Sequence, residues 1–105
     1  MARFVNDRVV RLEELVKVKP GVVASLALTP DSKLFAVAEG ESVSEETYEG
    51  DMIYHILSGK MAVVSGEDRA VLGPGDAIRV SAGREHRIEA VTAFKMIQTF
   101  VKKEK

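Results

Sequence analysis

Between residues 22 and 101 the chain alternates nine short runs of β-forming residues with separators that each contain Gly, Pro, Asp or Ser. These residue types tolerate the dihedral angles of turns or close turns with their own side chains. Because no helical pattern of about 10–15 residues lies between the runs, the spacing predicts an all-β antiparallel sandwich or barrel rather than a parallel sheet alternating with helices. Fifteen valines favour the same class, since β-branched side chains suit a pleated, half-buried surface. The runs cover residues 22–28, 33–38, 42–48, 52–57, 61–64, 70–72, 77–80, 86–91 and 94–101.

The first 21 residues differ from the rest of the chain because they show no strand period. Leu12, Leu15 and Val16 fall on one face of a helical turn over residues 11–16. A chain of 105 residues supports one core and leaves no room for a second. We therefore predict one domain over residues 1–105, with an N-terminal arm over 1–21, a barrel over 22–101 and a tail over 102–105.

Charge and residue usage exclude several classes of function. Fifteen Lys and Arg residues against sixteen Asp and Glu give a net charge of −1, so neither a nucleic acid nor an anionic membrane is expected as a partner. The absence of cysteine excludes disulfides, thiolate metal sites and cysteine nucleophiles. No apolar run approaches the roughly 18–20 residues of a membrane span, and the first residues do not resemble a signal peptide, so we expect a cytoplasmic protein. Asn6 and Gln98 are the only amide side chains among plentiful Glu and Lys, which is typical of heat-adapted proteins.

Two segments carry a resemblance to a known family. Residues 40–59 begin and end in glycine and contain two of the predicted strands. Residues 74–86 contain Pro-Gly-Asp, then an apolar strand, a small turn and His86. This turn pattern resembles the two motifs of a small single-domain cupin. The resemblance extends over about residues 22–101 and implies a conserved β-barrel of the cupin type, a double-stranded β-helix or jelly roll made of two Greek keys.

The metal-ligand positions of the cupin family are mostly changed in this chain. Counting back from Gly59, the two histidines of the first motif correspond to Glu46 and Tyr48, and its glutamate corresponds to Met52. Only the histidine of the second motif is kept, as His86. A thioether is a poor ligand for divalent ions and a phenol is seldom one. We therefore expect no strongly held divalent metal, and if one binds, its protein ligands are His86 and Glu46.

The resemblance and the strand period together predict a ligand pocket in the mouth of the barrel. Glu46 and Tyr48 share one strand parity, and Arg84 shares the parity of His86, so these polar groups are expected to point inward. A few convergent polar groups in an apolar cavity are typical of a small-molecule site. The predicted pocket residues are Glu46, Tyr48, Met52, Arg84, His86, Phe94 and Met96.

Each of these residues also has a structural interpretation. His86 is either a ligand, an acid–base group or a structural histidine in the mouth of the barrel. Glu46 and Arg84 either bind a ligand or neutralise each other at the rim, and the methionines either line a pocket or fill gaps in the core. Alternation places His55 on the strand face opposite Met52, so we expect it outside the cavity, unless a bulge reverses its direction.

Three functions are compatible with this pattern. The first is a cupin of unspecified activity that binds a small molecule without a strongly held metal. The second is a cupin enzyme, such as an isomerase, epimerase or metal-dependent oxygenase, which uses His86 and Glu46 with Tyr48 as a proton donor. The third is a scaffold whose dimer interface is its working surface. We expect a homodimer, because sheet edges are commonly protected by a second copy and two-fold dimers are the commonest assembly.

Overall fold

A computed structural model describes residues 6–46 and 48–102, and for residues 44–46 it describes the backbone alone. Nine strands follow a single short helical turn in this part of the chain. The strands are β1 (Val23–Thr29), β2 (Ser32–Val37), β3 (Ser42–Glu46), β4 (Asp51–Ser58), β5 (Met61–Ser65), β6 (Asp68–Leu72), β7 (Ala77–Val80), β8 (His86–Ala90) and β9 (Phe94–Val101).

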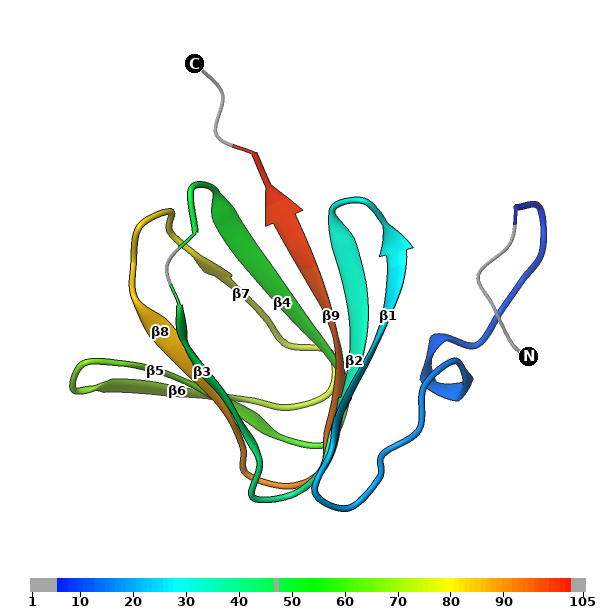
Figure 1. Cartoon of the computed structure of the whole chain (residues 1–105), viewed down its shortest axis with the longest axis horizontal. Helices are drawn as coiled ribbons and strands as arrows, with labels where there is room; N and C mark the ends of the chain where they lie inside the picture. The colour runs from blue at the N-terminus through cyan, green and yellow to red at the C-terminus, as the bar shows by residue number, and fades with distance from the viewer. Residues whose placement is uncertain (1–5, 47, 103–105) are drawn as a thin grey trace.

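The strands form two antiparallel sheets that face each other (Figure 1). The five-stranded sheet has the order β1-β2-β9-β4-β7, and the four-stranded sheet has the order β3-β8-β5-β6. Neighbours that are far apart in the sequence, such as β2 with β9 and β3 with β8, are typical of a jelly roll. The predicted all-β antiparallel class is confirmed.

The strand bounds follow the predicted runs to within two residues, and one such difference lies at the start of β6. This strand begins at Asp68, two residues before the predicted run. Asp68 pairs with Ser65 and Arg69 pairs with Val64, so the β5–β6 ladder continues up to a two-residue turn. Gly66 gives this turn its positive φ of 59°. Asp68, which the sequence predicts to lie in a turn, is therefore part of the hairpin strand.

The core lies between the two sheets and is made by alternate residues of each strand. In β4 the side chains of Met52, Tyr54 and Ile56 are buried, whereas His55 is exposed. Phe94 and Met96 of β9 face the same interior and are 1% exposed. The β4–β9 and β4–β7 pairings hold β4 in this register, because a slip of one residue would turn its apolar set outward.

The N-terminal arm covers part of the outer face of the five-stranded sheet. Its helical turn is a 3₁₀ helix, η1 (Leu12–Glu14), closed by a hydrogen bond from the Leu15 N–H to the Leu12 carbonyl at 3.1 Å. Val16 is 8% exposed and packs with Leu34 and Ala36 of β2. No helix in the described part of the chain has the length and apolar character of a membrane-crossing segment.

Candidate functional site

A buried hydrogen bond between Tyr54 and His86 joins the two sheets through the core. Tyr54 lies in the middle of β4 and is 2% exposed, and His86 is the first residue of β8 and is 3% exposed. The Tyr54 hydroxyl lies 2.7 Å from Nε2 of His86, and the two rings meet edge to face with centroids 5.7 Å apart. Both polar groups are therefore satisfied although both side chains are buried.

The neighbours of this pair fix the direction of its hydrogen bonds. Nδ1 of His86 lies 2.9 Å from the carbonyl oxygen of Arg84, which can only accept. Nδ1 therefore carries a proton, and in the neutral ring Nε2 accepts the hydrogen bond that the Tyr54 hydroxyl donates. The amide nitrogen of Gln98 lies 3.5 Å from the Tyr54 oxygen on its other side. The result is a directed chain from Gln98 through Tyr54 and His86 to the Arg84 carbonyl.

Tyr54 and Gln98 were not among the residues predicted for the site. A signal for both was present, because Tyr54 follows Met52 by two residues and Gln98 follows Met96 by two. Alternation places each of them on the same inner face as its neighbour. The family motif draws attention only to its own ligand positions, and neither residue occupies one.

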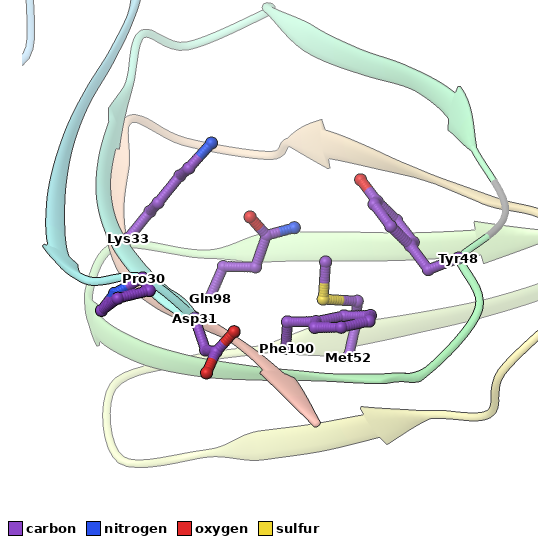
Figure 2. A pocket seen from close by; sticks show the side chains of 7 residues that line it. All are labelled: Pro30, Asp31, Lys33, Tyr48, Met52, Gln98 and Phe100. Carbon is purple, nitrogen blue, oxygen red and sulfur yellow. The ribbon is translucent and has the colours of Figure 1, made fainter. Parts of the chain in front are cut away.

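A cavity of about 350 Å³, which we call the mouth cavity, opens at one end of the barrel. The β1–β2 turn, the start of β4 and the end of β9 meet at this end (Figure 1). Met52 of β4 and Phe100 of β9 are partners in the strand pairing, and their side chains form the apolar wall. Figure 2 shows the polar ends of Lys33 and Gln98 above them. The lining residues are Pro30, Asp31, Lys33, Tyr48, Met52, Gln98 and Phe100.

A second, smaller cavity continues from the mouth cavity toward the buried pair. Its volume of about 20 Å³ is enough for one water molecule. Tyr48 and Gln98 line both cavities, so the two adjoin at these side chains. The inner cavity is completed by Phe35, Val43, Tyr54, His86, Ile88 and Met96.

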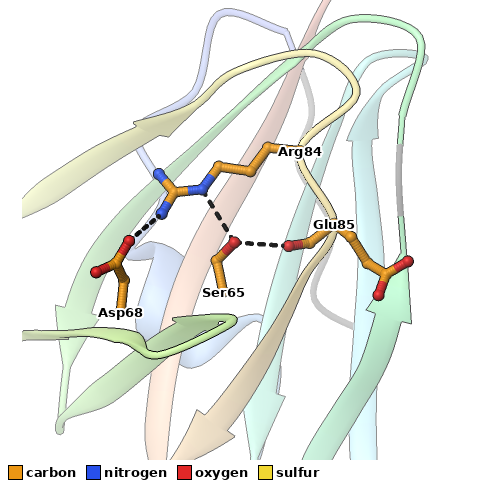
Figure 3. A network of polar contacts seen from close by, with 4 residues as sticks. All are labelled: Ser65, Asp68, Arg84 and Glu85. Atoms are coloured by element: carbon orange, nitrogen blue, oxygen red, sulfur yellow. Dashed lines mark hydrogen bonds and ion pairs between the residues drawn. The ribbon is translucent and has the colours of Figure 1, made fainter.

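A third cavity, which we call the side cavity, reaches His86 from β5, β6 and β7. Its volume is about 180 Å³. Three of its lining residues form a polar network, in which Arg84 donates hydrogen bonds to Ser65 and Asp68 (Figure 3). The lining residues are Val63, Ser65, Asp68, Arg69, Ala70, Ile78, Val80, Arg84 and His86.

Five of the seven predicted pocket residues line at least one of these three cavities. Tyr48 and Met52 line the mouth cavity, and Tyr48, His86 and Met96 line the inner one. Arg84 lines the side cavity and pairs with Asp68 at 3.2 Å. Phe94 packs in the core and lines none of the three. The Glu46 backbone pairs with His86, but its side chain lies outside the described part of the structure.

The described donor groups do not fit the divalent metal that the resemblance implies. Both ring nitrogens of His86 already have protein partners, Tyr54 on Nε2 and the Arg84 carbonyl on Nδ1. Within residues 6–43 and 48–102 no three His, Asp or Glu side chains gather closely enough to hold an ion. A metal on Nε2 would have to displace the Tyr54 hydroxyl from a buried hydrogen bond.

Comparison with known proteins identifies the family of this chain. Residues 33–100 match the family model described as Cupin domain. A cupin superfamily protein from Desulfitobacterium hafniense is 34% identical, with 97% of this chain and 100% of that chain covered and a TM-score of 0.85. A conserved protein of unknown function from Streptococcus pyogenes is 25% identical, with 100% and 98% covered and a TM-score of 0.86. A protein from Thermus thermophilus is 25% identical, with 88% and 96% covered and a TM-score of 0.73. None of the curated proteins matches the chain.

Proposed function

The chain belongs to the cupin family, and from this premise we propose that it binds a small molecule in the mouth cavity without a strongly held metal. One observation carries this proposal. Tyr48 and Gln98 line both the mouth cavity and the inner cavity that ends at Tyr54 and His86. A ligand at the mouth therefore meets side chains that touch the buried polar chain.

The size and lining of the mouth cavity support a small ligand with an apolar body. Its volume of about 350 Å³ lies in the lower part of the range of about 300–1,000 Å³ that is usual for such sites. Met52 and Phe100 offer an apolar wall, whereas Lys33, Asp31 and Gln98 offer a cation, an anion and an amide. A molecule with an apolar part and two or more polar groups suits this surface.

The hydrogen bonds of His86 support binding without a metal. Its two nitrogens are engaged at 2.7 Å and 2.9 Å inside the protein. Removing one partner from a buried hydrogen bond costs about 1–3 kcal/mol, which a metal would have to offset with few other protein ligands. In this proposal His86 organises the floor of the site through Tyr54.

The proposal is tested by thermal unfolding against a panel of small amphipathic metabolites. A ligand present at about 100 times its Kd adds roughly 2.7 kcal/mol of stability, which raises the Tm by roughly 10 °C or more in a domain of this size. Lys33→Ala should reduce this shift, because Lys33 lines the mouth cavity. The control variant Lys60→Ala, which changes an exposed lysine in the β4–β5 turn, should show the same Tm shift as the wild type. Equal shifts in the wild type and in Lys33→Ala for every stabilising compound would contradict the mouth site.

A second candidate function is proton-transfer catalysis, as in the isomerases and epimerases that the family resemblance implies. The observation that favours it is the hydroxyl of Tyr54 donating to Nε2 of His86 beside the inner cavity. A phenol held against an imidazole is suited to general acid–base work. Conversion of a bound compound into a product would favour this candidate over binding alone.

A further inference from the structure

The side cavity is separate from the mouth cavity in both position and lining. It lies between β6 and β7, which are the end strands of the two sheets. Among the described residues, His86 alone lines both the side cavity and the inner cavity. A molecule in the side cavity would therefore contact the far side of the buried polar chain without entering the mouth.

One part of the wall of the side cavity is apolar, and the volume of the cavity limits the size of an occupant. Val63 and Val80 are 6% and 3% exposed, and Ala70 and Ile78 lie beside them. An apolar cavity of about 150 Å³ in another protein accepts benzene. At about 180 Å³ the side cavity has room for one ring of similar size with a small substituent.

The rim of the side cavity is cationic. Arg69 and Arg84 both line it, and the guanidinium of Arg84 is held in place by Ser65, whose hydroxyl accepts from Nε at 3.0 Å. The Ser65 hydroxyl in turn donates to the carbonyl oxygen of Glu85 at 2.8 Å, as Figure 3 shows. A planar guanidinium in a fixed orientation is suited to a carboxylate, which it binds through two parallel hydrogen bonds.

Asp68 occupies the position that the carboxylate of a ligand would take. Its Oδ2 accepts from the terminal nitrogen of Arg84 at 3.2 Å, and its side chain is 84% exposed. An exposed ion pair of this kind contributes little to stability. A carboxylate that also places an apolar body against Val63 and Val80 would therefore replace Asp68 on Arg84.

We infer that the side cavity is a second binding site, which takes a small carboxylate with an apolar body the size of one ring. Arg84 binds the carboxylate, the valine and isoleucine side chains contact the ring, and Asp68 competes for Arg84 when the site is empty. This inference does not depend on the mouth site, because the residues that bind the ligand belong to the side cavity alone.

Benzoate is the probe, and its binding is followed by two-dimensional NMR of the purified chain. The wild type should bind benzoate at millimolar concentration or below, with shifts at the amides of Val63, Ile78 and Val80. Asp68→Asn should lower the Kd at least threefold because the competing carboxylate is removed. Arg84→Gln should raise the Kd at least tenfold, and benzyl alcohol, which lacks the charge, should bind no better to the wild type than to this variant.

Arg79→Gln is the matched control for charge. Arg79 lies on β7 and, like Arg84, pairs with an aspartate, Asp51, at 2.7 Å, but it does not line the side cavity. Its replacement should leave the Kd unchanged. Ala70→Trp, at an exposed position of β6, should block the cavity without replacing either arginine.

Five outcomes would overturn the inference. Three of them are no benzoate binding by the wild type at 10 mM, an unchanged Kd in Arg84→Gln and an unchanged Kd in Ala70→Trp. The other two are a loss of affinity in Arg79→Gln equal to that in Arg84→Gln, and shifts confined to the mouth residues Lys33 and Phe100. The last result would support the mouth site while rejecting the side cavity. Binding at the side cavity with no ligand at the mouth would do the reverse, so the two proposals are separable.

Discussion

Replacing Gly59 by alanine is expected to destabilise the fold by about 2–5 kcal/mol, which is the largest single effect that the structure predicts. Gly59 turns the chain from β4 into β5 with φ at 77°, a conformation that costs an L-residue about 1–2 kcal/mol. An added Cβ would also overlap the carbonyl oxygen of Ala93 and lie 2.7 Å from Cα of Phe94. Because both obstacles are backbone atoms, the turn or the start of β9 would have to move.

Gly66→Ala is the control for the cost of positive φ alone. Gly66 also lies in a hairpin turn and has φ at 59°, but an added Cβ there would meet no atom within 4 Å. We expect Gly66→Ala to lower the free energy of unfolding by about 1–2 kcal/mol. Urea unfolding followed by circular dichroism measures both variants. Equal losses of unfolding free energy in Gly59→Ala and Gly66→Ala would show that β9 does not lie as close to the β4–β5 turn as the structure places it.

The second large effect is expected from the buried pair. Tyr54→Phe should cost about 1–3 kcal/mol, because it leaves Nε2 of His86 buried without a donor. His86→Leu should cost a similar amount, because it removes the buried imidazole that accepts from the Tyr54 hydroxyl. In the double variant both polar groups are gone, and an apolar pair of similar shape can be nearly neutral.

Unfolding free energies of the four proteins in this double-mutant cycle measure the coupling between the two side chains. We expect the double variant to lose at least about 1 kcal/mol less than the sum of the single losses. Strict additivity, within about 0.5 kcal/mol, would mean that the hydroxyl and Nε2 do not interact. In that case the directed chain from Gln98 to the Arg84 carbonyl would have to be abandoned.

The strands could be predicted from the sequence because the signals that define them are local. Turn residues end each run, and alternation within a run tells which side chains face the core, as in Met52, Tyr54 and Ile56 of β4. The same rule correctly places His55 on the exposed face. These properties depend on neighbours within a few residues, which the sequence contains directly.

The partners across the core could not be predicted in this way. The bond between Tyr54 and His86 joins residues 32 positions apart in different sheets. Alternation gives the face of each side chain, but only the stacking of the sheets decides which groups meet. A bulge lies between Val43 and Glu46 in the pairing of β3 with β8, so the alternation of β3 is interrupted there.

Arg84 shows a second limit of the periodic argument. It shares the parity of His86, but β8 begins at His86, so strand alternation does not extend back to Arg84. Its carbonyl holds Nδ1 of His86, and its side chain turns to Ser65 and Asp68 of the β5–β6 hairpin. Arg84 therefore lines the side cavity and not the mouth cavity.

The central claim, that protein groups rather than a metal occupy both nitrogens of His86, is tested most directly by ¹⁵N NMR of the imidazole rings. The account predicts a proton on Nδ1 of His86, because the carbonyl of Arg84 can only accept. Adding one equivalent of Zn²⁺ or Mn²⁺ should leave the His86 signals unchanged, and Tyr54→Phe should move the Nε2 signal. A His86 ring with Nδ1 unprotonated, or a His86 signal that shifts or broadens with one equivalent of metal, would contradict the account.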